Sequence, residues 1–531
     1  MIGSPVSSTF RKYSRILGLS LLFEIYSIKD LPIVTLVMNV VTIYQEILLH
    51  PRNSPFPGLN ISAVNIPHPI RRSRLLDLHR GIRLTLSLQI LYWKSIFPWS
   101  GIPLNYDDAL QFLSGRHAKD MKLGLENIRS LLARLDNPER RFKSVHIAGT
   151  NGKGSTTAML ESILRESGYR TGLYTSPHLV DIRERIRIGG VAISRRDFLL
   201  EIADIQAAAE ETNASFFEIL TAVGFKVFAD RGVDIAVVET GLGGRLDATN
   251  LITPELAVIT EIGLDHTRIL GTDMETIAAE KAGILKPGVP AVIGTQITAV
   301  KNFFEGEGKR RGAVLRYVMD SVKTENIRLA ESGTLLNAWV GDRRFRDLRL
   351  RLLGAHQVEN AATVLLIVDE LRSQGWAIPE RAVYDGLAKT VWRARLELLQ
   401  IAPKIVLDSA HNGLGAKRLA HAIEEIFLYR NLTLVFGVLS DKDYGTMAEI
   451  LFPLADRIIL TRPDNERALD PYILAELPVC RGLRIEISEE IGRAWEFAMK
   501  RTRHNDLVCA AGSIYFVGEI LRLMGENACG E

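Results

Sequence analysis

The chain has 531 residues, 47% hydrophobic and 24% charged, a composition typical of globular proteins and a length too great for one hydrophobic core. The net charge is +3, but residues 1–100 carry 11 Lys or Arg against 4 Asp or Glu, so the remainder is slightly acidic. This distribution argues against nucleic-acid binding. The three cysteines, Cys480, Cys509 and Cys529, have no CxxC spacing and fit a reducing compartment. We therefore expect a cytoplasmic protein of two or three domains that binds neither nucleic acid nor membrane.

Residues 1–105 differ in composition from the rest of the chain. In this segment a Pro-rich middle part separates an apolar stretch from a basic one. No signal-peptide pattern is recognisable. The uncharged run 31–45 has 15 residues, whereas a membrane-spanning helix needs about 20. We interpret this run as a buried or interfacial helix, with a membrane anchor as the alternative. The whole segment is predicted to be a poorly ordered extension without chemistry, or the product of an upstream start codon that is not used.

From about Tyr106 helical and strand patterns alternate, which predicts an α/β fold with a mostly parallel sheet. We predict a P-loop ATPase domain at 106–392 and a smaller, Rossmann-like α/β domain at 393–531. Ligands of such sheets bind beyond the carboxyl ends of the strands. The predicted strands are 144–148, 235–239 and 256–260 in the first domain, and 405–407, 432–436 and 507–511 in the second.

The strongest local pattern is HIAGTNGKGSTT at 146–157, a strand followed by a Gly-rich turn and a helical stretch over 158–165. Backbone N–H groups of such a turn bind phosphate oxygens, and Lys153 can reach the terminal phosphates. The spacing departs from GxxxxGK[ST], because Gly154 separates Lys153 from Ser155. A Gly-rich turn with a solvated lysine is the alternative. The predicted ATP-binding residues here are Gly149, Thr150, Asn151, Gly152, Lys153, Gly154, Ser155 and Thr156.

Three further loops each supply one hard ligand: Ser176 in YTSPHL, Glu239 in ETGLGGR and His266 in GLDHT. Magnesium takes one or two carboxylates together with substrate phosphates, so the set is chemically sensible beside an ATP loop. Each residue alone has a structural alternative. Ser176 could cap a turn, Glu239 could pair with Arg245, His266 could bond within its loop, and Lys281 in AEKAG could be a surface lysine.

Ten motifs together carry a resemblance to a known family. HIAGTNGKGS, TSPHL, ETGLGGRLDATN, GLDHT and EKAGILKPG are similar, in this order, to the ATPase domain of folylpolyglutamate synthases/dihydrofolate synthases, within the Mur-ligase-like superfamily. The similarity continues through AHQVENAA, RARLEL, LDSAHN, SDKD and AGSIYFVGE. Two departures lie at the domain junction, where Arg393-Ala394-Arg395 replaces Pro-Gly-Arg, and Ser409 replaces the Gly of Asp-Gly-Ala-His-Asn.

The resemblance implies a role for each matching residue. Lys153 binds ATP phosphates, Ser176, Glu239 and His266 hold Mg²⁺, and Lys281 matches a lysine that becomes carbamylated and assists a second metal. Lys153, Lys281 and His266 are thereby the implied catalytic residues. Nucleotide contacts are implied for Asn360, Arg395, Asp408 and His411. A pterin substrate is implied at Ser215, Phe216, Phe217, Glu218, Leu246, Asp247 and Ala248.

The function implied is that of an ATP-dependent ligase that adds L-glutamate to dihydropteroate, reduced folates or both through an acyl phosphate. We expect a monomer, because domain closure usually suffices for such catalysis. The SFFE and RLDA segments favour the bifunctional enzyme. One alternative is a peptidoglycan-precursor amino-acid ligase of the Mur type, which GKGS in place of GKT[ST] disfavours. The other is a P-loop switch or transport ATPase that forms no amide bond.

Overall fold

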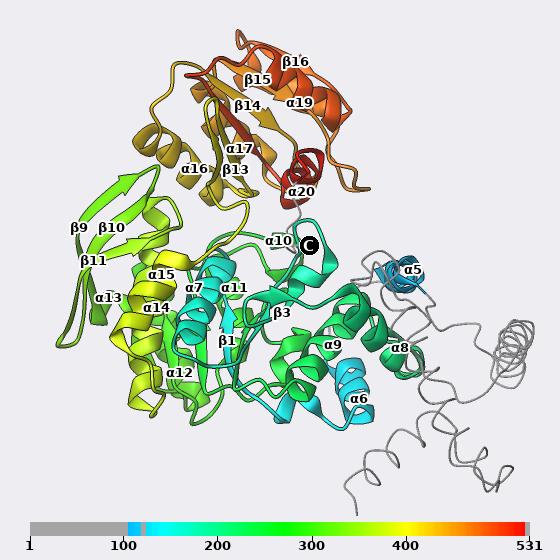
Figure 1. Ribbon diagram of the computed structural model, residues 1–531, viewed down its shortest axis with the longest axis vertical. Helices are drawn as coiled ribbons and strands as arrows, with labels where there is room; N and C mark the ends of the chain where they lie inside the picture. The colour runs from blue at the N-terminus through cyan, green and yellow to red at the C-terminus, as the bar shows by residue number, and fades with distance from the viewer. Residues whose placement is uncertain (1–104, 118–123, 526–531) are drawn as a thin grey trace, which may run out of the picture. The chain divides into compact units, whose positions relative to one another are not determined.

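The computed structural model describes residues 105–117 and 124–525, all within one compact unit that spans 99–531 (Figure 1). The predicted extension up to residue 104, its apolar run 31–45 and Cys529 lie outside the described residues. No helix in the described part of the chain is long and apolar enough to cross a membrane.

The first sheet has eight strands in the order β4-β3-β2-β5-β1-β6-β7-β8. Strands β2, β5, β1, β6, β7 and β8 are parallel, and β3 and β4 form an antiparallel edge. The bounds are β1 (Lys143–Ala148), β2 (Thr171–Tyr174), β3 (Ile186–Ile188), β4 (Val191–Ala192), β5 (Ile235–Glu239), β6 (Leu256–Ile259), β7 (Ala291–Ile293) and β8 (Leu315–Tyr317). The three strands predicted from short apolar runs are confirmed. Since β5, β1 and β6 are neighbours, the loops that follow them meet at one edge of the sheet.

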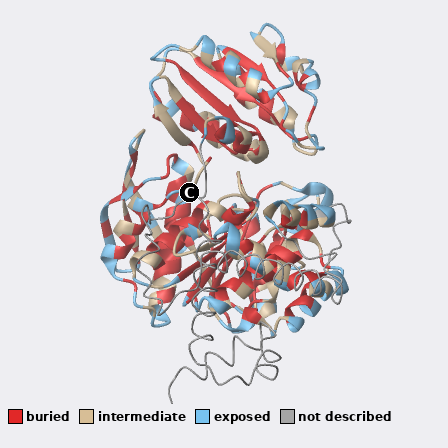
Figure 2. Cartoon of the chain, turned by 45° about the vertical axis from the view of Figure 1, so that its right-hand side comes forward, coloured by how far each residue is buried: buried red, intermediate tan, exposed pale blue. Residues whose placement is uncertain are grey.

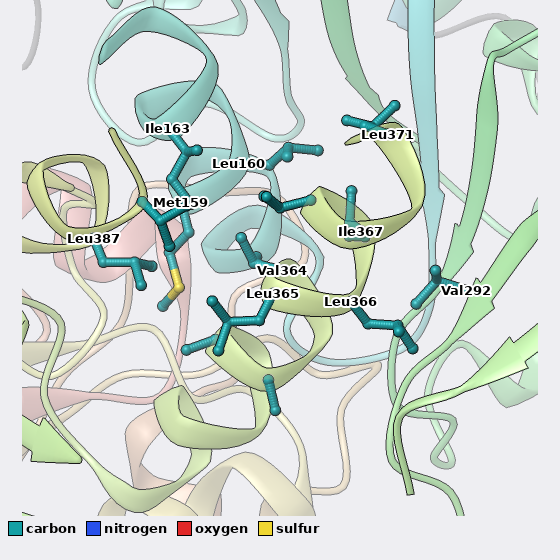
Figure 3. Close-up of a cluster of buried hydrophobic side chains, with 14 of the residues drawn as sticks. Met159, Leu160, Ile163, Val292, Val364, Leu365, Leu366, Ile367, Leu371 and Leu387 are labelled. Carbon is teal, nitrogen blue, oxygen red and sulfur yellow. The ribbon is translucent and has the colours of Figure 1, made fainter. Parts of the chain in front are cut away.

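Helices cover both faces of this sheet, because successive side chains of a strand point to opposite faces. On β5, Ile235 and Val237 join one hydrophobic cluster, whereas Ala236 and Val238 join another. Figure 3 shows the first cluster, in which Met159 and Leu160 on the helix 153–166 pack with Val364 on the helix 355–373. The helices are α5 (Tyr106–His117), α6 (Glu126–Arg134), α7 (Lys153–Glu166), α8 (Arg195–Glu211), α9 (Phe216–Asp230), α10 (Thr267–Leu270), α11 (Met274–Lys281), α12 (Thr298–Arg311), α13 (Val318–Ser321), α14 (Ala355–Ser373) and α15 (Glu380–Lys389).

A three-stranded antiparallel sheet, which the sequence analysis did not predict, packs against α14. It consists of β9 (Val322–Ala330), β10 (Gly333–Val340) and β11 (Arg343–Leu350). Along β10, the buried residues Leu336, Ala338 and Val340 alternate with half-buried ones. This period of two is the signal that a strand search could have used. We call the two sheets and their helices the first lobe.

The second lobe is a six-stranded sheet in the order β12-β13-β17-β14-β15-β16, with helices on both sides. Only β12 is antiparallel, so the predicted second α/β sheet is confirmed. The four central strands of this sheet are buried, whereas its helices carry exposed residues (Figure 2). The strands are β12 (Glu397–Ile401), β13 (Lys404–Asp408), β14 (Leu432–Phe436), β15 (Arg457–Leu460), β16 (Ile485–Ile487) and β17 (Leu507–Ala511). The helices are α16 (Gly413–Ile426), α17 (Tyr444–Leu451), α18 (Pro471–Ala475), α19 (Ile491–Lys500) and α20 (Ile514–Leu523).

A core substitution tests the packing of α14. Leu366 is 0% exposed, so Leu366→Ala leaves a cavity and is expected to lower the free energy of unfolding by about 2–5 kcal/mol. Leu200, 54% exposed on α8, is the matched control, and Leu200→Ala is expected to change stability by less than about 0.5 kcal/mol. Urea denaturation followed by circular dichroism measures both. Equal midpoints for the two variants would contradict the assigned packing.

Candidate active site

The loop between β1 and α7 has the strand–turn–helix form that the sequence predicted. Gly152 precedes α7 with φ 82°, a left-handed conformation that favours glycine. A Cβ atom there would lie 2.3 Å from Oδ1 of Asn360, so α14 closes against the loop. The backbone N–H of Thr150 donates to the Glu261 carbonyl over 2.8 Å, which fixes the loop to the end of β6. The N-terminus of α7 is thereby held at the carboxyl edge of the sheet, where an anion can bind.

Lys153 is half-buried and folds back over the loop. Its Nζ donates to the carbonyl oxygens of Gly149 and Thr150 over 3.0 and 3.1 Å. Burial lowers the pKa of Lys153, while the carboxylates of Glu239 and Asp265 act against this shift. The lysine is thus held within a polar cavity and does not extend into solvent, so an anion placed there meets a nearby ammonium group.

One cavity collects most of the residues predicted to bind ATP and metal. The predicted residues that line it are Gly149, Thr150, Asn151, Gly152, Lys153, Gly154, Ser155, Ser176, Glu239, His266, Lys281, Asn360, Arg395, Asp408 and His411. Thr156 and the seven predicted pterin-binding residues do not line it. Since the last three of the lining residues belong to the second lobe or its junction, the cavity is built by both lobes.

Glu239 ends strand β5 and is only 4% exposed. Burial raises its pKa to about 7, although Lys153 opposes the shift. Its Oε2 accepts a weak hydrogen bond of 3.4 Å from the backbone N–H of Ser176. The alternative pairing with Arg245 is not found, because Arg245 contacts Glu280 over 2.8 Å. Glu239 therefore remains a buried carboxyl group without an arginine partner on its own loop.

The hydroxyl oxygen of Ser176 is buried and has no hydrogen-bond partner among the described residues. A buried hydroxyl without a partner costs free energy, so a turn-capping role does not explain it. His266 lines the same cavity. Its side chain is 39% exposed, yet desolvation lowers its pKa to about 4, which leaves the imidazole neutral and able to bind a metal. Within the described ranges no three His, Cys, Asp or Glu side chains form a metal-binding group. Ser176, Glu239 and His266 nevertheless fit Mg²⁺, which completes its shell with water and substrate phosphates.

Lys281 lies at the end of α11. The alternative interpretation, that it is a surface lysine, is wrong. Lys281 is 4% exposed, and its Nζ donates to the Gly149 carbonyl oxygen over 2.8 Å. Burial, with repulsion from Lys153, lowers its pKa to about 7. A substantial neutral fraction near pH 7 makes this amine a nucleophile.

Asp265, which is not among the predicted site residues, connects the two lobes. Its carboxylate lies 2.8 Å from Nζ of Lys442, 3.3 Å from Nε2 of His411 and 3.5 Å from Nδ2 of Asn412. Burial would raise the pKa of Asp265, but His411 and Lys442 outweigh this and hold it below its usual range. The motifs GLDHT and SDKD contain Asp265 and Lys442, so the opposite charges of this pair were visible in the sequence.

Asp408 lines the cavity, but its two carboxylate oxygens are used by the backbone. They accept the N–H groups of Leu396 over 2.7 Å and of Ala410 over 2.8 Å. Leu396 and Ala394, which flank Arg395, both have left-handed backbones, with φ of 50° and 54°. We infer that Asp408 holds the junction that places Arg395 in the cavity.

The predicted pterin-binding residues shape the loops beside the cavity. Ser215 and Glu218 form a capping box at the start of α9, in which the Ser215 N–H donates to Glu218 over 2.8 Å. Phe217 lies against Gly241, where a Cβ atom would come within 2.4 Å of the ring. Asp247 accepts the N–H of Leu242 over 2.7 Å, fixing that loop. Phe216 and Ala248 are buried, whereas Leu246 is half-buried. A pterin role for these residues stays a prediction.

Comparison with known proteins decides the family. The chain is 35% identical over 426 residues to the dihydrofolate synthase/folylpolyglutamate synthase of Bacillus subtilis, covering 78% of this chain and 98% of that protein. The chain belongs to the folylpolyglutamate synthase/dihydrofolate synthase family. Profiles of the Mur ligase middle domain and of the Mur ligase glutamate ligase domain match residues 147–368 and 394–514. The resemblance noted from the motifs is confirmed.

Solved structures of the family share the fold. The Mycobacterium tuberculosis folylpolyglutamate synthase complexed with ADP is 32% identical, with a TM-score of 0.75 over 80% of this chain and 98% of that chain. Escherichia coli FolC in complex with DHPP and ADP is 29% identical, with a TM-score of 0.73 over 79% of this chain and 98% of that chain. The two-lobed α/β fold of this family member is therefore shown.

The two departures from the family motifs have physical consequences at the junction. Ala394 occupies a left-handed conformation that the family glycine adopts without strain, a cost of about 1 kcal/mol. Ser409 places a buried hydroxyl, without a partner in the described part of the chain, where the family has no side chain. Neither change removes Arg395 or Asp408 from the cavity.

The close approach of α14 to the phosphate loop can be tested with two glycines of similar backbone conformation. Gly152 and Gly189 both have positive φ, but a Cβ atom meets no neighbour within 4 Å at Gly189. Gly152→Ala should displace the loop from Asn360 and weaken ADP binding on the order of tenfold to 100-fold. Gly189→Ala, the control, also places an alanine at positive φ and should bind ADP without loss. Isothermal titration with ADP measures both, and equal affinities would contradict the proposed nucleotide site.

Proposed function

We propose that this chain is an ATP-dependent ligase that joins L-glutamate to a folate-type carboxylate, either dihydropteroate or a reduced folate or both. One observation carries the proposal. A single cavity holds the Gly-rich loop, the buried Glu239 with the unpartnered Ser176 hydroxyl, and groups from the second lobe. Relatives in Bacillus subtilis and Escherichia coli, the latter 32% identical, are both named dihydrofolate synthase/folylpolyglutamate synthase, which supports the bifunctional activity.

The proposed reaction has two steps. The γ-phosphoryl group of ATP passes to an oxygen of the substrate carboxylate, which gives an acyl phosphate and ADP. The neutral amine of glutamate then attacks the acyl carbon, the amide bond forms, phosphate leaves and the amine gives up a proton. Transfer of a phosphoryl group requires mainly positioning and charge stabilisation, which Lys153, Arg395 and the N-terminus of α7 supply.

Ser176, Glu239 and His266 are the residues that would hold Mg²⁺. When bound, the cation neutralises charge on the phosphate oxygens. Glu239 contributes the one carboxylate of this set. Because this carboxylate is buried, few other groups compete with a cation for it. The neutral imidazole of His266 adds a ligand without adding charge.

Lys281 is proposed to become a carbamate when its neutral amine attacks the carbon of CO₂ and the nitrogen releases one proton. The reaction replaces a buried cation with a carboxylate-like anion. Relief of the repulsion between Lys281 and Lys153, which share the Gly149 carbonyl oxygen, favours this change. The resulting anion would help to hold a second cation.

The contacts between lobes are proposed to exclude water from the acyl phosphate. Besides the Asp265–Lys442 pair, Arg418 on α16 contacts Glu261 over 2.8 Å and Glu359 over 2.9 Å. Closure of such a site limits hydrolysis of a reactive intermediate. The cytosolic location and the monomeric state stay predictions from the sequence.

The substrate requirement separates the three candidate functions. ADP release should depend on both L-glutamate and either dihydropteroate or tetrahydrofolate, because the acyl phosphate needs an acceptor. A Mur-type ligase would need a UDP-muramyl substrate, and a P-loop ATPase would release ADP without either. Lys153→Ala should abolish turnover, whereas Lys309→Ala, on an exposed part of α12, should not. Full turnover by Lys153→Ala would refute the proposed role of the loop.

Carbamylation of Lys281 can be measured with ¹³C-bicarbonate. A carbamate resonance should grow as pH rises through about 7, because the protonated amine that predominates below the Lys281 pKa does not react with CO₂. Lys281→Ala should lose both this resonance and the ligase activity. A spectrum that is the same for the wild type and Lys281→Ala would rule out the carbamate.

A further inference from the structure

The segment that follows Ser176 lies between the two lobes and is held by both. From its own lobe, the carboxylate of Glu184 accepts three consecutive backbone N–H groups, those of Leu179, Val180 and Asp181, over 3.0, 2.8 and 2.6 Å. Glu184 is 7% exposed, so these are buried, charge-assisted hydrogen bonds. They fix the N–H side of the segment and leave its carbonyl oxygens for other partners.

The second lobe binds the opposite side of the same segment. Arg522 on α20 donates from Nη2 to the Val180 carbonyl oxygen over 2.7 Å. Gly518, one turn earlier, lies directly against Leu179, since a Cβ atom at position 518 would be 2.0 Å from the Leu179 carbonyl oxygen. Helix α20 thus contacts the segment through a glycine that permits close approach and an arginine that supplies a hydrogen bond.

The side chain of Leu179 belongs to the hydrophobic core of the second lobe. It is 8% exposed and joins the cluster that includes Val517, Ile520 and Leu521 of α20. Val180 packs against the same cluster. A leucine from the first lobe is therefore inserted into the second, three residues after the unpartnered Ser176 hydroxyl.

We propose that Leu179 and helix α20 are positioning elements for the cation site, which is complete only when Leu179 is inserted in the second lobe. Gly518 and Arg522 hold the segment 176–181 in the shape that keeps Ser176 beside Glu239. This role accounts for AGSIYFVGE at 511–519, the motif that no contact with the cavity explains. The inference rests on the proposed function only in taking Ser176 as a cation ligand.

Two helical glycines give a matched test in the full chain. Gly518→Ala favours the helix itself but collides with Leu179, whereas Gly492→Ala, in α19, meets no atom closer than 3.6 Å. Gly518→Ala should accelerate amide hydrogen exchange in residues 176–184. It should also raise the Mg²⁺ concentration that half-saturates Mg²⁺-dependent ADP binding by about tenfold to 100-fold. Gly492→Ala should change neither quantity.

Arg522→Ala provides a second variant with an unaltered helix backbone, and Arg481→Ala, on an exposed turn of the same lobe, is its control. Arg522→Ala should accelerate exchange at the same segment, and Arg522→Lys should restore part of the protection. Unchanged exchange and unchanged Mg²⁺ dependence in Gly518→Ala and Arg522→Ala would overturn the proposal. Neither readout requires glutamate ligation, so a wild-type enzyme that forms no amide would refute the proposed function alone.

Discussion

The constraint on which the site depends is the burial of several charged groups in one cavity. Glu239, Lys153 and Lys281 all lie at the edge of the first sheet. Burial raises the pKa of Glu239 and lowers the pKa of both lysines, which favours the neutral form of each group. No tight ion pair among the described residues joins Glu239 to either lysine. Desolvated groups of this kind are stable when a ligand supplies the missing charges. The proposed ligands, ATP and Mg²⁺, match both signs.

The fold makes this burial possible because parallel strands bring distant loops together. Glycines 149 and 152 let the phosphate loop pass close to Thr260 and Asn360, so the helix N-terminus of α7 faces the cavity. The second lobe closes the cavity from the other side through Asp265, which takes contacts from Lys442 and His411. The first lobe therefore supplies the carboxylate of this contact, and the second lobe supplies the ammonium and imidazole groups that pair with it.

Buried carboxylates position the loops that carry the cavity groups. Asp408 uses its oxygens to hold the junction around Arg395, and Glu184 uses its oxygens to hold the segment after Ser176. Leu179 links that segment to the core of the second lobe. In both places a buried carboxylate accepts backbone N–H groups and thereby fixes a loop that carries a cavity residue.

Local patterns were sufficient to predict the strands β1, β5, β6, β14 and β17, the Gly-rich strand–turn–helix loop and the family, because apolar runs, glycine spacing and motif order are local properties of the chain. Strands β9–β11 were missed, although their period of two was present. The capping box of Ser215 and Glu218 is likewise a local pattern, S-x-x-E, that the sequence offered. The burial of Lys281 and the pairing of Asp265 with Lys442 required the tertiary structure. Such facts depend on which residues the topology brings together across more than 100 positions, and no local pattern encodes them.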